Sequence, residues 1–150
     1  MNPHIDYLKY VIRHKWFVFQ ETLKLKDIRL IWRGLVHDMS KFGPREFWAY
    51  SKYFYGRNKG VDRYSFDVSW NYHQKLNDHH WQFWVLINDS GEIVPLSMPV
   101  ICIQEMICDW KGAGRALGMP NTKEWYIKNY SKIMLHVDTR KIVNDILGVI

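Results

Sequence analysis

The segment 35–42 carries three chemically different groups close together. His37 and Asp38 are adjacent, and Lys41 follows three residues after Asp38. Residues three or four apart share one side of a helix, so these side chains can meet there. An imidazole and a carboxylate are both ligands of first-row metal ions, and a nearby ammonium can hold an anionic oxygen. The segment therefore predicts a metal site, if other parts of the chain supply further ligands.

Three more histidines lie close together further along the chain. His73, His79 and His80 fall within eight residues of a segment that is rich in aromatic side chains. If this segment is one continuous helix, His73, Asn77 and His80 lie on one stripe of it. Packing does not readily explain such a group, whereas closely set imidazoles suit the metals that bind nitrogen ligands. We therefore predict a functional role for these histidines.

One histidine near the N-terminus and one acid late in the chain complete the candidate set. His14 lies in an apolar stripe, where a single buried histidine most often has simply found a hydrogen-bond partner. Asp109 lies four residues after Glu105 on a helix that is suited to the interior. A buried carboxylate is costly without a partner, so Asp109 either pairs with a lysine or arginine or binds a metal. His136 is expected at a helix terminus or on the surface.

Apolar residues at intervals of three and four predict helices along almost the whole chain. We expect Asp27, Ser97 and Asn121 to cap helix N-termini, and a short extended segment at 91–96. These signals predict an all-α fold, a single compact domain over 1–150 with about six or seven helices. The predicted helices are 3–20, 27–40, 44–55, 65–87, 99–116, 121–136 and a last one that ends near 148.

The same periodicity assigns faces to the first two helices. The residues predicted to face the core are Leu8, Ile12, Trp16 and Phe19 in the first helix and Ile28, Ile31, Trp32, Leu35 and Met39 in the second. The first helix has another apolar stripe, which contains His14. Gly34 lies one turn before His37, where a missing side chain lets another helix or a ligand approach closely.

The composition is that of a globular protein. Of 150 residues, 47% are hydrophobic and 16% aromatic, which is enough to build a core. The net charge of +6 suits an anionic partner such as a phosphorylated small molecule, a nucleotide or nucleic acid. A solvated basic surface explains this charge equally well. The polar stretch 56–63 is a candidate lid over a site.

Neither a membrane span nor an export signal is expected. No apolar run approaches the roughly 20 residues that cross a bilayer, and the N-terminus lacks the pattern of a signal peptide. Cys102 and Cys108 are six residues apart on a predicted helix and off the same face, so we expect no disulfide between them. Two unpaired, core-like cysteines are typical of a cytoplasmic protein.

The order of these residues resembles that of the HD-domain superfamily of metal-dependent phosphohydrolases. The family pattern is a histidine on one helix, an adjacent His-Asp on the next, further histidines, and a distant aspartate on a later helix. Residues 35–41 are similar to the family's Leu-x-His-Asp-x-x-Lys stretch, and the resemblance extends over 14–109. The dense aromatic content and the short interval from Asp38 to His73 depart from typical members. The chain is also similar to a set of bacterial and phage proteins with comparable His-Asp and His-His segments.

The resemblance implies one or two divalent metal ions, with Mn, Fe, Co, Ni, Zn and Mg as candidates. It assigns His14, His37, Asp38 and Asp109 to one ion, with Asp38 bridging to a second ion held by His73 and by His80 or His79. Lys41 and Asp38 would be the catalytic residues, with Lys41 binding the phosphate. Glu105 would support a ligating histidine from outside the site.

Three functions are compatible with this sequence. The first is a hydrolase that cleaves phosphoester bonds, nucleotides included, with a metal-activated hydroxide. The alternative is a non-catalytic helical module that binds nucleic acid or another partner through a basic, aromatic-rich surface. The third is a structural bundle with a polar core. Ligands gathered from four helices favour the hydrolase, because a binding module has no need of them. Exposed aromatic residues would favour a homodimer.

Overall fold

The computed structural model describes residues 2–57 and 62–149. Within them the chain forms seven α-helices and one two-stranded antiparallel hairpin, so the predicted all-α bundle of six or seven helices is confirmed. The helices are α1 (Pro3–Lys24), α2 (Ile28–Val36), α3 (Pro44–Tyr55), α4 (Arg63–Leu76), α5 (Val100–Ala116), α6 (Thr122–Asn129) and α7 (Val137–Leu147). The strands are β1 (Val85–Ile87) and β2 (Ile93–Pro95), and the short 3₁₀ helices are η1 (Met39–Phe42), η2 (Trp81–Trp84) and η3 (Tyr130–Lys132).

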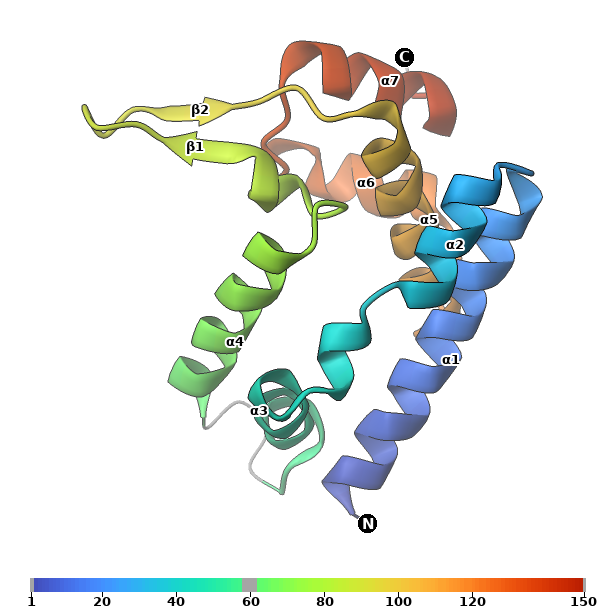
Figure 1. Ribbon diagram of the computed structural model, residues 1–150, viewed down its shortest axis with the longest axis vertical. Helices are drawn as coiled ribbons and strands as arrows, with labels where there is room; N and C mark the ends of the chain where they lie inside the picture. Colours follow the sequence, from blue (N-terminus) through green and yellow to red (C-terminus); the bar gives the residue numbers. More distant parts are fainter. Residues whose placement is uncertain (1, 58–61, 150) are drawn as a thin grey trace.

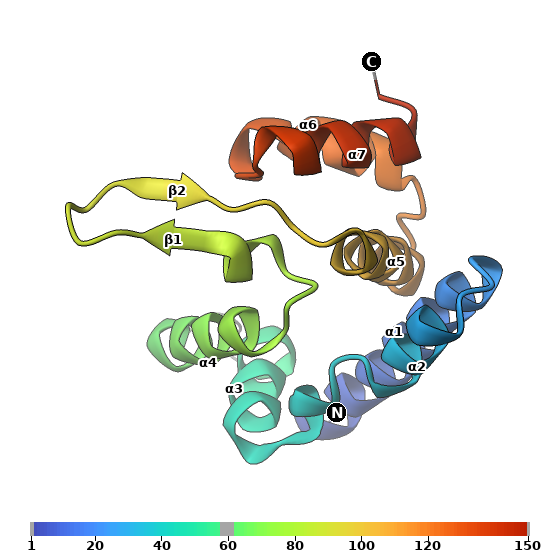
Figure 2. The same cartoon turned by 45° about the horizontal axis from the view of Figure 1, so that its top comes forward.

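Two pairs of helices pack against α5, and a third pair packs on one of them. Helices α1 and α2 lie side by side against one side of α5, and α6 and α7 pack on another (Figures 1 and 2). Helices α3 and α4 form a third pair that packs on α1, while the β1–β2 hairpin projects away from the helices (Figure 1). The centre of the molecule is therefore lined by helices from distant parts of the chain.

Two groups of buried apolar side chains hold the pairs together. The group that joins α5 to α6 and α7 includes Ile103, Met106, Tyr126 and Val143. The group that joins α1 to α3 contains Tyr7, Val11, Ala49 and Tyr50. Helices α1 and α5 pack against each other between these groups. Polar residues on their facing sides, such as His14 and Asp109, are buried as a result.

Two of the three predicted N-terminal caps are confirmed. Asp27 Oδ1 accepts a hydrogen bond from the backbone N–H of Arg29 at 2.9 Å, at the start of α2. Asn121 caps α6 by accepting from the backbone of Glu124. The prediction for Ser97 is wrong, because α5 starts after Pro99 with no side-chain cap. A proline in the position before a helix leaves no side chain that could accept such a bond.

The prediction of a continuous helix over 65–87 is wrong beyond Leu76. Asn77 is extended, with φ −111° and ψ 108°, and its side-chain amide donates to the carbonyl of His73 at 2.8 Å. An asparagine that bonds to the local backbone in this way competes with the helix. The segment 78–80, with its two histidines, is therefore a turn and does not share a helical stripe with His73. The predicted extended segment at 91–96 is confirmed, because strand β2 lies inside it.

The assignment of faces in α1 and α2 is also wrong. The residues Leu8, Ile12, Trp16, Ile28, Trp32, Leu35 and Met39 are exposed, while Phe19 and Ile31 are half-buried. The opposite sides are buried, with Val11, His14 and Val18 on α1 and Leu30 and Gly34 on α2. Helical periodicity shows that a stripe is apolar, but it does not show which neighbour covers that stripe.

Three smaller expectations concern the cysteines, membrane spans and the lid. Cys102 and Cys108 are free and buried, as predicted. Among the described helices, none combines the length and the apolar character that crossing a bilayer requires. The candidate lid at 56–63 falls largely on residues 58–61, which lie outside the described residues.

Candidate metal centre

Asp38 reaches the centre of the molecule because helix α2 ends before it. The helix was predicted to continue to about Ser40, but it ends at Val36, and Asp38 has the left-handed backbone conformation with φ 52° and ψ 30°. Aspartate is one of the few residues that tolerate this conformation, and such residues gather at functional sites. The 3₁₀ turn that follows brings Lys41 back over Asp38, whose carboxylate it pairs with. The predicted contact between Asp38 and Lys41 is present, but it is formed by the 3₁₀ helix η1 and not by a continuous α-helix.

His14 and Asp109 meet where α1 and α5 cross. Their side chains approach to 3.1 Å between His14 Nε2 and Asp109 Oδ1. The crossing is close because α5 has Gly112 one turn after Asp109. A Cβ atom at Gly112 would lie 2.5 Å from Val18 Cγ2 and 2.8 Å from the Val18 backbone nitrogen. Gly112 in α5 therefore lets α1 approach closely enough for His14 to contact Asp109.

His14, His37, Asp38 and Asp109 form the first group of candidate ligands. All four are buried, and one ligand atom from each lies within 4.8 Å of the others. His37 Nε2 is 3.2 Å from Asp38 Oδ2 and 3.3 Å from Asp109 Oδ1. His14 Nε2 is 3.5 Å from the same oxygen of Asp38. Two imidazoles and two carboxylates at these distances match the donor set of a first-row divalent metal.

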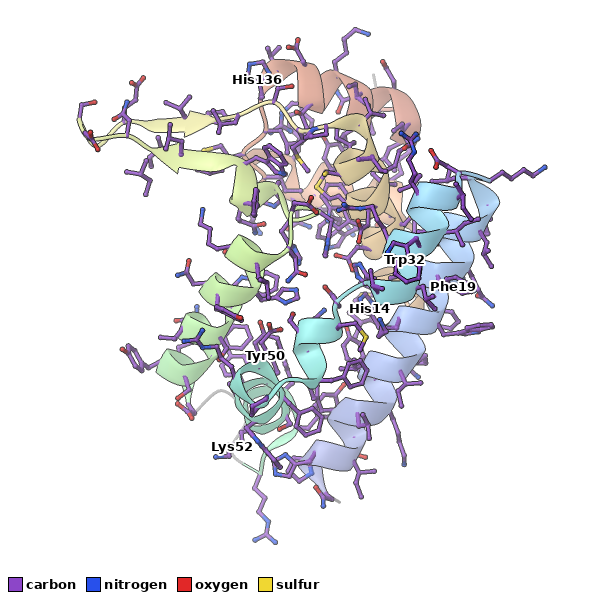
Figure 3. All side chains as sticks on the ribbon, in the orientation of Figure 1. His14, Phe19, Trp32, Tyr50, Lys52 and His136 are labelled. Atoms are coloured by element: carbon purple, nitrogen blue, oxygen red, sulfur yellow. The ribbon has the colours of Figure 1, made fainter. Side chains whose placement is uncertain are left out.

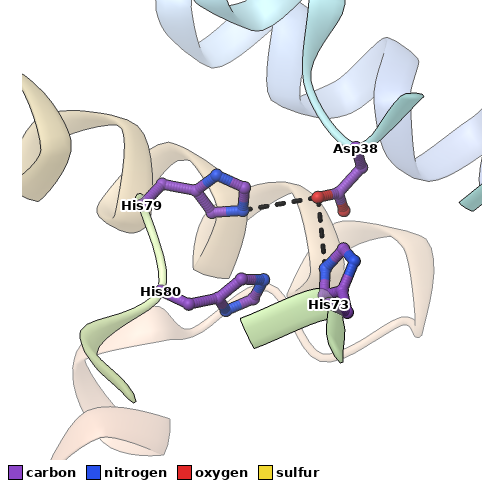
Figure 4. A group of neighbouring side chains, drawn as sticks. All are labelled: Asp38, His73, His79 and His80. Carbon is purple, nitrogen blue, oxygen red and sulfur yellow. Dashed lines mark ion pairs between the residues drawn. The ribbon is translucent and has the colours of Figure 1, made fainter. Parts of the chain in front are cut away.

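Asp38, His73, His79 and His80 form the second group (Figure 4). It uses the other oxygen of Asp38, since Oδ1 lies 3.3 Å from His73 Nε2 and 3.4 Å from His79 Nε2. His73 comes from α4, and the following two histidines come from the turn after it. Asp38 therefore belongs to both groups through different oxygens, which is the arrangement of a carboxylate that bridges two cations.

The imidazole nitrogens that face this centre have no hydrogen-bond partner. The Nε2 atoms of His14, His37, His73, His79 and His80 are buried and unpaired among the described residues, and so is Asp38 Oδ1. Several lie 3.1–3.5 Å from a carboxylate oxygen, yet none of these contacts has the geometry of a hydrogen bond. Unpaired buried polar atoms are costly, and atoms aimed at a shared point suit a cation there. The residues therefore fit a metal.

Glu105 contacts two of these histidines at Nδ1, the ring nitrogen that does not face the centre. Its Oε1 atom lies 3.0 Å from His37 Nδ1 and 3.4 Å from His79 Nδ1. A carboxylate at Nδ1 keeps a proton on that nitrogen and directs Nε2 toward the centre. Burial lowers the pKa of His37, but the acidic side chains around it together raise it by more, so a metal at Nε2 would displace a proton. The other oxygen of Glu105 pairs with Arg33, which also pairs with Asp78. Glu105 therefore contacts a histidine of each group, and its role in supporting a ligating histidine stays a prediction.

The contact between Glu46 and His73 was not predicted from the sequence. This acid is fully buried on α3, and its Oε2 atom lies 2.8 Å from Nδ1 of His73. The Ser40 hydroxyl is 3.2 Å from the same nitrogen. A single acid among the aromatic residues of α3 could have been noticed by the argument that identified Asp109, because a buried carboxylate needs a partner. Arg33 offered no comparable signal, since arginines are common on helix surfaces.

Both aspartates at the centre are anionic. Burial raises the pKa of Asp38, but the charges of His37 and Lys41 outweigh it and hold this pKa well below its usual range. Burial also raises the pKa of Asp109, and its contacts with His14 and His37 bring it well below the usual range. Ionised carboxylates are the form that binds metal ions.

His80 and Lys41 have the protonation states that metal binding and anion binding would need. Burial lowers the pKa of His80 well below its usual value, and the neighbouring His79 lowers it further, so its imidazole is neutral. Burial lowers the pKa of Lys41, but Asp38 and Asp109 raise it by more, and the side chain remains an ammonium. A neutral imidazole is the ligand form of histidine.

A cavity of about 260 Å³ opens beside the first group. Its polar lining consists chiefly of Lys41, His14, His80 and Asp109. Its walls are aromatic and include Tyr10, Tyr50, Phe66 and Trp70. A small molecule in this cavity would contact the candidate ligands at one end and aromatic rings along its length.

One family model matches the chain. Residues 3–149 match a family described as a family of unknown function, DUF5662. The chain belongs to this family. Searches of curated proteins and of solved structures gave no match.

All the site residues predicted for this DUF5662 chain come together in the structure. They are His14, His37, Asp38, Lys41, His73, His79, His80 and Asp109. His136 lies elsewhere, at the start of α7, where it accepts a hydrogen bond from the backbone of Asp138 (Figure 3). His136 does lie at a helix terminus, but at the N-terminus of α7, because the helix predicted over 121–136 already ends at Asn129.

Proposed function

We propose that this protein is a metal-dependent phosphohydrolase of the HD-domain type that acts on a phosphorylated small molecule. The observation that carries the proposal is the pair of ligand groups that share Asp38, with five buried imidazole nitrogens aimed at them. A helical protein that only binds a partner through its surface has no need of these groups. Burying them would then cost stability without a return in function.

Two divalent cations held in these groups would supply an activated water and neutralise charge on a phosphoryl group. Asp38 would hold both cations, while His14, His37 and Asp109 would complete the first group and His73, His79 and His80 the second. This nitrogen-rich set favours Mn, Fe, Co, Ni or Zn over Mg, which prefers oxygen ligands.

Lys41 would bind the phosphate of the substrate. Its ammonium lies against Asp38 and lines the cavity, so it can contact an anion there without being a metal ligand. It is a point charge with three donors, which suits the oxygens of a phosphate group. A charged lysine that is almost fully enclosed would also gain a second anionic partner when the substrate binds.

The cavity favours a small substrate. At about 260 Å³ it is close to the lower limit of ligand pockets, about 300 Å³. Its aromatic walls would pack on an apolar or planar part of the substrate, and a nucleotide base is one candidate. The positive net charge of the chain agrees with an anionic substrate.

The test measures metal content and hydrolysis on the same preparations. The purified protein should bind a divalent metal and cleave a phosphorylated small molecule in a screen with added manganese, nickel or cobalt. Asp38→Ala should lose both properties. Lys41→Met should keep the metal and lose about 10- to 100-fold in kcat/KM, because a charge-assisted hydrogen bond contributes about 1.5–3 kcal/mol.

Two substitutions serve as controls. Lys52→Met removes an exposed lysine of α3, and His136→Ala removes a histidine outside the centre, so both should leave metal and hydrolysis unchanged. Full metal content in Asp38→Ala would contradict the assignment of the centre. Unchanged hydrolysis in Lys41→Met would remove its role in phosphate binding.

A further inference from the structure

Helices α1 and α2 each present an apolar stripe to the outside of the molecule. The exposed residues are Leu8, Ile12 and Trp16 on α1 and Ile28, Trp32 and Leu35 on α2. Each set is spaced by three or four residues, so it lies along one side of its helix. The two helices lie side by side (Figure 2), and Figure 3 labels Trp32 on α2. We call these six residues the α1–α2 face.

A groove joins the two stripes. This cavity of about 290 Å³ is lined by Ile12, Trp16, Phe19, Leu35 and Phe42, with Gly34 and Lys15. Among the described residues that line it, Lys15 alone is charged. Its ammonium already donates to the carbonyl oxygens of Leu35, at 3.3 Å, and of His37. Covering the groove would therefore not bury an ammonium that lacks hydrogen-bond acceptors.

The exposed apolar area is larger than a monomer normally carries. The six side chains are between 36% and 76% exposed, and each presents on the order of 200 Å² when fully exposed, which gives a face of about 700 Å². The largest apolar patch of a typical monomer is about 300–600 Å². One partner of a standard interface contributes about 800 Å². The α1–α2 face thus has the size of one half of a stable dimer interface.

We propose that the α1–α2 face binds the same face of a second copy of this chain, which makes a dimer with two-fold symmetry. A two-fold axis places one patch against its own copy, so the patch must be complementary to itself. This face offers both parts, an apolar ridge on α2 and an apolar groove beside it, and helices pack ridges into grooves. The one charged side chain among the described residues of the groove, Lys15, already donates to two backbone carbonyls, and the rest of this lining favours an apolar partner over an acidic peptide or a lipid headgroup.

The test is the mass of the protein in solution. Sedimentation velocity and light scattering of the wild-type chain at tens of micromolar should give twice the mass of one chain. Trp32→Glu and Ile28→Glu should each weaken self-association at least tenfold, because each would bury a carboxylate without a partner. Both residues are largely exposed in a single chain, so circular dichroism should show an unchanged helical spectrum.

Val137→Glu is a matched control. Val137 and Ile28 are each the first residue of a helix, and they are 73% and 76% exposed. The control variant should remain a dimer. A monomeric wild-type chain would overturn the proposal, and so would a dimer that persists in Trp32→Glu and Ile28→Glu. Flotation of a monomeric wild-type chain with phosphatidylserine vesicles, lost in Trp32→Glu, would assign the face to a membrane surface and overturn the dimer.

Discussion

Asp38 contacts both groups of candidate ligands through separate oxygens. Its Oδ2 atom faces His14 and His37, and its Oδ1 atom faces His73 and His79. A helical conformation at this position would direct the carboxylate differently, so the left-handed backbone of Asp38 is part of the site. Glu105 also contacts both groups, but through a single oxygen, because its Oε1 atom lies near one histidine of each group.

Glu105 contacts a histidine of each group, whereas Glu46 contacts a histidine of the second group only, and this difference leads to a prediction. Glu105→Gln should weaken metal binding in both groups, by about 10- to 100-fold, because two ligating histidines lose the carboxylate that orients them. Glu46→Gln should weaken only the second group, because Glu46 contacts His73 alone among the ligands. Calorimetric titration of the metal-free protein would measure the affinity and the number of ions bound.

Glutamine has nearly the shape of glutamate, so both variants should keep the fold, and each serves as the control for the other. Identical titrations for Glu105→Gln and Glu46→Gln would mean that the two ligand groups are not linked through Glu105.

The crossing of α1 and α5 determines whether His14 and Asp109 can meet. Gly112 faces the backbone of Val18 at this crossing, and backbone atoms cannot move aside as a flexible side chain can. Glycine inside a helix normally costs about 0.5–1 kcal/mol relative to alanine. Its presence in α5 is therefore explained by the close approach of α1.

Gly112→Ala should reverse the usual stabilising effect of alanine in a helix. The added Cβ would push the two helices apart, lower the free energy of unfolding by about 1–3 kcal/mol, and weaken metal binding because His14 moves away from Asp109. Gly114→Ala is the control on the same helix, since its Cβ would meet the carbonyl of Met119 and not α1. Denaturant unfolding and metal titration would check both. Equal metal affinity in the two variants would contradict this account of the crossing.

The candidate centre joins four separate parts of the whole molecule. Its ligands come from α1, from the turn after α2, from α4 with the turn after it, and from α5. A bound ion would hold these parts together and would be absent from the unfolded chain. Metal binding should therefore contribute to stability.

Removal of metal should lower the melting temperature. An ion present at 100 times its Kd stabilises by about 2.7 kcal/mol, and a domain of this size shifts by about 2–4 °C per kcal/mol. We expect a chelator to lower Tm by roughly 5–10 °C in a calorimetric scan. The Asp38→Ala protein should show no such shift. If the chelator lowers Tm equally in both proteins, the ion that matters for stability lies outside this centre.

Local patterns in the sequence predicted most of the helices and the set of candidate site residues. Apolar spacing predicted the helices, and Asp27 and Asn121 marked where two of them begin, because capping depends only on neighbouring backbone groups. The types and spacings of the His-Asp pair and of the other histidines predicted which side chains are candidate ligands, because few other side chains bind metals.

The orientation of these elements required the folded molecule. The end of α2 at Val36 and the end of α4 at Leu76 are set by Asp38 and Asn77, whose conformations depend on what surrounds them. Which stripe of α1 faces inward depends on the helices packed against it, and both of its stripes are apolar. The contact of Glu46 with His73 depends on the packing of α3 beside that histidine, so only the folded structure reveals it. Contacts between residues far apart in the chain arise from packing, which local spacing does not encode.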